Sequence, residues 1–218
     1  TGEEIVKALW RVDIQSDFLP GGARAVPKGE AVIAVANRLR PAYPLVVATQ
    51  DWHPAGHQSF ASAHPGRSVG DVVDLHGMQQ ILWPDHCVQD TPGAELCGDL
   101  DRWRIAGVVR KGTDPNFDSY SGFHDNGRHK STGLARLLRD RGASAVDVMG
   151  LATDYCVKFT VLDALAEGFD TSLLVTGCQG VDRQPGDCAR AIEAMQKAGA
   201  RMVGQTPVAA RPRFDAST

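Results

Sequence analysis

One cysteine of this sequence stands where a predicted strand runs into a predicted helix. Residues 145–152 are mostly apolar, a helix is predicted to start at Thr153, and Cys156 falls in its first turn. The start of a helix carries a partial positive charge and unpaired N–H groups, which favour ionisation of a thiol. Because a thiolate is a nucleophile, this position suits covalent catalysis. The alternative is that Cys156 is a small buried side chain, as most free cysteines are.

Two further groups that a thiol hydrolase needs follow other apolar strands. Asp13 ends one predicted strand and Lys111 follows another. A carboxylate can take the thiol proton and return it to a leaving amine, while an ammonium group favours the thiolate. Alone, the two residues would be interpreted as a buried ion pair; opposite Cys156 they predict a catalytic triad. The backbone N–H groups of Ala152 and Cys156 are candidates for an oxyanion hole.

A second set of residues has the types that bind a divalent metal ion. The set combines one carboxylate with two imidazoles, which leaves positions open to water and suits zinc or iron at a catalytic site. The alternative is an ordinary surface turn, since loops often hold histidines. The predicted ligands are Asp51, His53 and His86, with His57 and Ser59 as further candidates close to them in sequence.

Three aromatic residues fall in the loops that follow the same strand ends. Phe18, Trp83 and Tyr120 could form the walls of a flat pocket for an aromatic-sized ligand. The alternative is that these side chains pack within their loops without contacting any ligand.

Alternating strands and helices must position these residues. Continuously apolar strands separated by helices indicate an α/β fold, a three-layer α/β/α arrangement around a mostly parallel sheet of about six strands. The carboxyl ends of parallel strands share one edge, where ligands bind, so the polar residues are expected to converge there. The predicted strands are 8–14, 45–49, 105–110, one beginning at Ala145, 172–176 and 201–203. The predicted helices are 29–40, 132–140, one beginning at Thr153, and 185–198.

The remaining segments show little regular pattern. Residues 54–100 and 112–131 are rich in glycine and polar residues, and long irregular segments inside a domain are usually functional. Arg11 is unusual in a strand expected to be buried, so we expect it at a sheet edge or paired with a carboxylate. The tail from Pro207 is expected to be irregular. Since no repeat or linker is present, we predict a single domain over residues 1–218.

Composition excludes several classes of protein. The 218 residues carry a net charge of −3, which gives no reason to expect nucleic acid or an anionic membrane as partner. No apolar run approaches the ~20 residues of a membrane span. The five cysteines form no CxxC pair, which argues against a zinc ribbon or a secreted disulfide framework. The first residues have no signal-peptide pattern, so we expect a cytoplasmic protein.

Taken together, these motifs are similar to those of a known family. The sequence resembles the nicotinamidases and pyrazinamidases of the isochorismatase-like cysteine hydrolase superfamily, from about residue 8 to about residue 205. The segments that carry the resemblance are Val12-Asp-Ile-Gln-Ser-Asp-Phe18, Gln50-Asp-Trp-His-Pro-Ala-Gly-His-Gln-Ser-Phe60, Trp83-Pro-Asp-His-Cys87, Arg110-Lys-Gly112, Asp118-Ser-Tyr-Ser121, Phe123-His-Asp-Asn126 and Met149-Gly-Leu-Ala-Thr-Asp-Tyr-Cys-Val-Lys158.

The resemblance implies an isochorismatase-like fold and hydrolysis of nicotinamide, and of pyrazinamide, to the acid and ammonia through a cysteine thioester in NAD salvage. It implies one divalent metal ion, with zinc favoured and iron or manganese open, that holds the pyridine nitrogen. It also implies a cis peptide bond before Ala152 and leaves a homo-oligomer open. The implied roles are a triad of Asp13, Lys111 and Cys156, metal ligands Asp51, His53 and His86, and ring-pocket residues Phe18, Trp83 and Tyr120.

Two other hypotheses about the function remain open. The first is another amidase of the same superfamily, acting on carbamoyl or ureido substrates; those relatives share the triad but generally lack the metal ligands. The second is a metal-binding or ligand-binding protein without catalytic activity, which predicts an unreactive Cys156.

Overall fold

The structure of the protein is a computed structural model that describes residues 6–103 and 105–204. The predicted irregular tail from Pro207 and the first five residues, on which the signal-peptide expectation rests, lie outside the described residues. None of the described helices is both long enough and apolar enough to cross a bilayer.

A central sheet dominates the described part of the chain and contains six strands in the order β5-β2-β1-β6-β7-β8. Every neighbouring pair in it is parallel, which confirms the predicted architecture. The strands are β1 (Val6–Val12), β2 (Leu45–Asp51), β5 (Ile105–Lys111), β6 (Ala143–Leu151), β7 (Asp170–Gln179) and β8 (Arg201–Val203).

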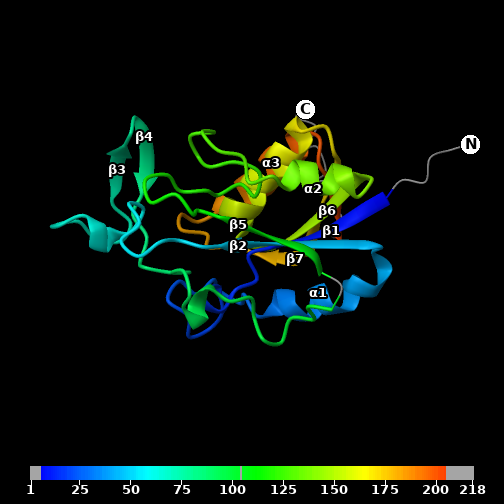
Figure 1. Ribbon diagram of the computed structural model, residues 1–218, viewed down its shortest axis with the longest axis horizontal. Coiled ribbons are helices and arrows are strands. Elements are labelled where there is room, and N and C mark those ends of the chain that lie inside the picture. Colours follow the sequence, from blue (N-terminus) through cyan, green and yellow to red (C-terminus); the bar gives the residue numbers. More distant parts are fainter. Residues whose placement is uncertain (1–5, 104, 205–218) are drawn as a thin grey trace, which may run out of the picture.

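Helices cover both faces of this sheet (Figure 1). Helix α1 lies on one face and α2 and α3 lie on the other, with α4 packed beside α3. The connections explain the split, because β1 to β2 and β6 to β7 step across the sheet in opposite directions and crossovers are right-handed. The helices are α1 (Ala31–Leu39), α2 (Leu134–Asp140), α3 (Lys158–Ala166) and α4 (Asp187–Lys197), with short 3₁₀ turns at Ser16–Phe18, Arg40–Ala42, Ala61–Ala63 and Pro92–Ala94.

The middle strands are buried because helices and loops cover them on both sides. Leu9, Val47 and Val148 are fully buried, as expected for apolar runs in the centre of a parallel sheet. The edge strand β5 is partly solvated, and Val108 keeps 44% of its surface exposed. The core is therefore continuous through β2, β1 and β6.

Two local features differ from the sequence prediction. The segment 54–100 is not wholly irregular, because β3 (Val72–Leu75) and β4 (Met78–Ile81) form an antiparallel hairpin. Its turn uses His76 and Gly77 at φ 55° and 83°, the left-handed conformations that a two-residue hairpin turn requires. The helix expected to start at Thr153 begins with a π-helical turn, Thr153–Val157, before α3.

Arg11 does not lie at a sheet edge, because β1 is central and the side chain is fully buried. Its guanidinium group donates hydrogen bonds to the carbonyl oxygens of Ala36, at 2.8 Å, and Asp101, at 2.5 Å. The arginine therefore ties α1 and the loop before β5 to the underside of the sheet, where an aliphatic side chain would leave both carbonyls without these donors.

Arg11→Met is expected to lower the free energy of unfolding by about 2 kcal/mol, because one buried and one partly buried carbonyl group lose a charged donor. Urea denaturation measures the effect. The control is Arg136→Met, which removes a side chain that is 87% exposed and forms an ion pair with Asp140 one turn away. Equal stability of the two variants would show that the buried hydrogen bonds of Arg11 contribute nothing.

Candidate active site and metal centre

The carboxyl ends of four strands meet at one edge of the sheet, and the predicted polar residues lie there. Asp51 and Lys111 are paired residues at the ends of β2 and β5. Asp13 follows β1, whose last residue, Val12, pairs with Gly150 of β6. Cys156 lies one turn beyond the end of β6. Residues from distant parts of the sequence therefore converge as expected.

The ammonium group of Lys111 is the centre of this cluster. Its Nζ lies 2.9 Å from Asp13 Oδ2, 2.7 Å from Asp51 Oδ1 and 3.4 Å from Cys156 Sγ, and it donates to the carbonyl of Ser119 at 2.8 Å. The acidic and thiol atoms lie within 4.8 Å of one another. Such a set could hold a metal ion, but the lysine cation already bonds to every member of it. We therefore interpret the set as the predicted triad, with Asp51 as a second partner of Lys111.

Backbone geometry at two strand ends brings the triad together. Asp13 has φ 49°, a left-handed conformation that Asp tolerates better than most residues, and it turns the chain out of β1. Gly150 has φ 129°, and a Cβ atom there would lie 2.1 Å from the carbonyl oxygen of Val12. Only glycine allows β6 to approach β1 so closely. The peptide bond between Leu151 and Ala152 is cis, which confirms the expectation from the family resemblance.

Burial changes the acid–base chemistry expected for the triad. Burial raises the pKa of the Cys156 thiol well above its usual value, and the neighbouring Lys111 offsets this only in part. Burial therefore opposes the lowering of this pKa that was expected from the start of a helix. Burial likewise raises the pKa of Asp13 against the opposing effect of Lys111. A buried neutral thiol needs a proton acceptor, and Asp13 lies beside it with an increased affinity for protons.

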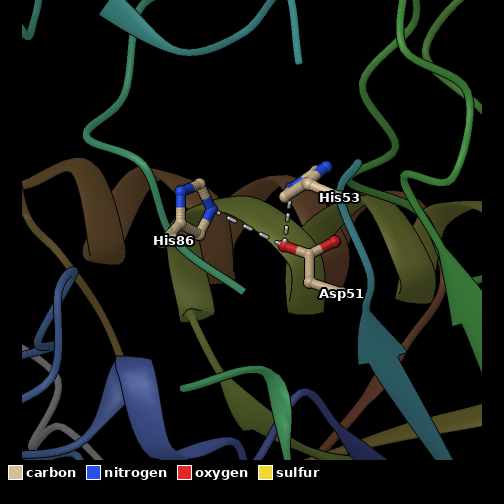
Figure 2. A group of neighbouring side chains, drawn as sticks. All are labelled: Asp51, His53 and His86. Carbon is tan, nitrogen blue, oxygen red and sulfur yellow. Dashed lines mark ion pairs between the residues drawn. The ribbon is translucent and has the colours of Figure 1, made fainter. Parts of the chain in front are cut away.

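The predicted metal ligands Asp51, His53 and His86 are buried and lie together, with one ligand atom of each within 4.8 Å of the others. Figure 2 shows the Asp51 carboxylate directed between the two imidazole rings. Its Oδ2 atom lies 3.5 Å from Nε2 of His53 and 3.8 Å from Nε2 of His86. The residues therefore present one oxygen and two nitrogens to a common point.

Hydrogen bonds orient the rings of His53 and His86 so that Nε2 of each faces the point shared by the three ligand residues. Nδ1 of His53 lies 2.9 Å from the carbonyl oxygen of Gly112, and Nδ1 of His86 lies 2.7 Å from that of Pro84. Since a carbonyl only accepts, each Nδ1 carries a proton, and Nε2 is the nitrogen left to bind a metal ion. Burial acts to lower the pKa of His53, but the neighbouring Asp51 outweighs it and raises this pKa, so a metal ion would displace a proton from the ring. This arrangement is the usual support for a metal-binding histidine.

The electrostatics and hydrogen bonding of these side chains fit a divalent cation. Among the described residues, the buried Nε2 of His53 has no hydrogen-bond partner, which is unusual for a buried polar atom. Burial lowers the pKa of His86 to about 3, with a further contribution from His53, so this ring is a neutral ligand at physiological pH. Burial alone would raise the pKa of Asp51, but Lys111 and His53 outweigh it and keep the carboxylate ionised.

The two additional ligand candidates, His57 and Ser59, bond to each other instead of joining this group. Nδ1 of His57 lies 2.8 Å from the Ser59 hydroxyl and accepts the Ser59 N–H at 3.0 Å. The His57 ring packs against His53, with centroids 4.5 Å apart. His57 therefore packs against a predicted ligand, and neither His57 nor Ser59 belongs to the group of ligand atoms formed by Asp51, His53 and His86.

A cavity beside Cys156 contains all three predicted aromatic residues. Trp83 Nε1 donates to the Tyr120 hydroxyl at 3.1 Å, which fixes two of the walls relative to each other. Asp51 and His86 also line the cavity, so the thiol and part of the metal-ligand group face the same space. The lining residues are Phe18, Arg24, Val26, Asp51, Trp83, His86, Asp118, Tyr120, Ala152, Tyr155, Cys156 and Val181.

Several residues around this cavity could not be identified as site residues from the sequence. One is the buried Gln80 of β4, whose side-chain amide donates to Asp118 Oδ2 at 3.3 Å and to the Tyr120 hydroxyl at 3.2 Å. Arg24 lies 3.7 Å over the Trp83 ring. Gln80 belongs to the unpredicted hairpin, and Arg24 to a loop without periodicity. Only the position of Tyr155, next to Cys156, could have indicated a site residue.

Comparison with known proteins places this geometry in a family. Residues 7–206 match the Isochorismatase domain. A nicotinamidase of Escherichia coli is 50% identical over 200 residues, covering 90% of this chain and 93% of the relative. The structure of a nicotinamidase and pyrazinamidase of Acinetobacter baumannii has a TM-score of 0.88 at 39% identity, covering 93% and 97% of the two chains. A zinc complex of a Pyrococcus horikoshii pyrazinamidase has a TM-score of 0.73 at 39% identity, covering 91% and 98%.

Proposed function

The chain belongs to the isochorismatase family, and from this premise we propose that it hydrolyses nicotinamide to nicotinate and ammonia. The observation that carries the proposal is the shared cavity, in which Cys156 faces Asp51 and His86 between aromatic walls. A thiol positioned for acyl transfer and a ligand set for a Lewis acid suit a flat ring that carries both a carboxamide and a basic nitrogen. The similarity to nicotinamidases supports the same substrate.

In the acylation step, the Cys156 sulphur attacks the amide carbon and its proton passes to Asp13. Lys111, 3.4 Å from Sγ, stabilises the developing thiolate. The N–H groups of Ala152 and Cys156 donate to the oxyanion. Asp13 then gives the proton to the departing ammonia, which leaves a nicotinoyl thioester on Cys156.

In the deacylation step, Asp13 takes a proton from water, and the resulting hydroxide attacks the thioester carbon. The same N–H groups bind the second oxyanion, and its collapse releases nicotinate while the sulphur recovers a proton. A divalent ion held by Asp51, His53 and His86 would supply a Lewis acid that binds the ring nitrogen of the substrate. The aromatic walls Phe18, Trp83 and Tyr120 orient the ring and exclude water.

The proposal extends to several finer points. Zinc is the favoured ion, with iron or manganese open, and pyrazinamide is a second substrate because it is also a small planar azine amide. The role in the cell is NAD salvage in the cytoplasm, by a single domain that spans the chain.

A comparison of substrates tests the proposal against the nearest alternative in the same family. The purified protein should release ammonia from nicotinamide with a kcat/KM at least about a hundredfold above that for a ureido substrate, because buried groups left unpaired discriminate strongly. A preference for the ureido substrate, together with no bound metal in elemental analysis, would support the alternative amidase. No turnover of either, with an unreactive Cys156, would support a binding protein.

His86→Ala is expected to reduce metal content and to lower kcat/KM for nicotinamide by at least about a hundredfold, since even supporting groups of metal ligands cost 10–100-fold. Elemental analysis and ammonia release measure the two effects. Treatment of the unaltered protein with a chelator should give the same loss, reversed by zinc. The control is His76→Asn, at the turn of the β3–β4 hairpin and outside both the ligand group and the cavity lining, where Asn tolerates the left-handed backbone. Full activity in metal-free His86→Ala protein would contradict the proposed metal role.

A further inference from the structure

Arg24 is a charged residue of the cavity that the proposed reaction does not use. It comes from the loop between β1 and α1 and lines the cavity together with Cys156 and Trp83. Its guanidinium carbon lies 3.7 Å from the centroid of the Trp83 ring, a cation–π contact that holds the side chain against the wall. Its backbone N–H donates to the carbonyl of Asp17 at 2.9 Å. Arg24 is therefore an ordered part of the site and not a freely solvated side chain.

Among the described residues no ion pair joins the guanidinium group of Arg24 to a carboxylate, although the charge of Asp118 acts on its pKa from a greater distance. The acidic side chains of the cavity are engaged elsewhere, because Asp51 pairs with Lys111 at 2.7 Å and Asp118 accepts the N–H of Ser119 at 2.7 Å. Burial lowers the pKa of Arg24, and among the neighbouring groups Cys156 opposes this shift most strongly. A half-buried guanidinium beside the reacting sulphur, without a counter-ion, is therefore available to an anionic ligand.

The proposed reaction creates an anion at this place. Nicotinamide is neutral, whereas its product is a carboxylate at neutral pH because carboxylic acids have pKa values near 4. The carboxylate carbon is the atom that the Cys156 sulphur releases, so the new charge appears beside the thiol, in the cavity that Arg24 lines. A guanidinium group matches a carboxylate through charge-assisted, often bidentate hydrogen bonds.

Building on the proposed function, we propose that Arg24 makes the cavity selective for ring carboxylates over neutral ring ligands, so that the enzyme retains its own acid product. Two consequences follow. Nicotinate competes with nicotinamide as a product inhibitor, and other flat aromatic carboxylates bind in the same place. Arg24 is thus a determinant of ligand selectivity that acts in product release, separate from the groups that carry out acyl transfer.

Calorimetric titration of the metal-loaded protein tests this inference without requiring turnover. The ligands are nicotinate and pyridine-3-methanol, a neutral ring of similar size, and the measured quantity is the ratio of their dissociation constants. Arg24→Gln should weaken nicotinate about tenfold more than pyridine-3-methanol, as expected for one lost charge-assisted hydrogen bond. Arg24→Lys keeps the charge and should retain most of the preference. The control is Arg128→Gln, which removes the same charge from a surface pair with Asp163 and should leave the ratio unchanged.

The inference is overturned if Arg24→Gln weakens both ligands equally or neither, or if the unaltered protein shows no preference for nicotinate. This failure is distinct from failure of the proposed function, which would appear as absence of ammonia release from nicotinamide by the unaltered protein. The ratio of dissociation constants is measured at equilibrium and requires no turnover. The binding result can therefore be interpreted whether or not the unaltered protein releases ammonia.

Discussion

Cys156→Ser is expected to lower kcat/KM for nicotinamide by at least about ten-thousandfold, the size of loss seen when a covalent nucleophile is removed. A hydroxyl is far less acidic than a thiol, so Asp13 deprotonates it much less readily. The substitution changes one atom in a buried position, so the fold and the metal-ligand group should remain intact. Steady-state ammonia release measures the loss, and elemental analysis checks that metal is still bound.

Cys188→Ser is the matched control for this variant. Cys188 is half-buried and is not among the residues that line the cavity beside Cys156. It should keep nearly full turnover under the same conditions. If Cys156→Ser protein retained more than a tenth of the activity of this control, the thioester mechanism would be wrong.

Asp13→Asn is expected to reduce kcat by about a thousandfold, because the site loses the group that accepts the thiol proton and returns it to ammonia. Asn also tolerates the left-handed backbone at this position, φ 49°, so the turn after β1 should persist. Lys111 keeps its partner Asp51 at 2.7 Å and should stay charged. The loss should therefore appear in kcat much more than in the dissociation constant of a non-reacting ring ligand.

A second buried carboxylate provides the control for Asp13→Asn. Asp147 accepts a hydrogen bond from the Tyr43 hydroxyl at 2.6 Å and lies 3.4 Å from Lys7, away from the cavity. Asp147→Asn should lower stability while leaving turnover of the folded protein close to normal. Near-normal kcat in Asp13→Asn protein would show that another group shuttles the proton.

The convergence of the catalytic and metal-ligand residues at one edge of the sheet could be predicted, because it follows from a general property of parallel sheets. Strands with continuous apolar runs form parallel sheets, and the carboxyl ends of those strands share one edge. Asp51 and Lys111 end two such strands, and Asp13 directly follows a third, so their proximity needed no knowledge of loop structure. The aromatic walls were predictable for the same reason, since Phe18 and Trp83 follow the same edge.

What could not be predicted depends on long-range packing. Gln80 reaches the wall of the cavity only because a hairpin forms around His76, and His-Gly is not a recognised turn signal. Arg11 was misplaced because its partners are backbone carbonyls of Ala36 and Asp101, which have no sequence signature. The expectation for the pKa of Cys156 rested on the helix start alone, whereas burial, which raises this pKa, follows from the whole fold.

The most direct measurement of the central claim is the joint release of ammonia and nicotinate from nicotinamide by the purified, metal-loaded protein. Nicotinate is measured by chromatography and ammonia by a coupled assay on the same samples, with Cys156→Ser protein prepared in parallel. We predict equal amounts of both products from the unaltered protein and a signal at background from the variant. Absence of both products, or equal release by the variant, would contradict the account.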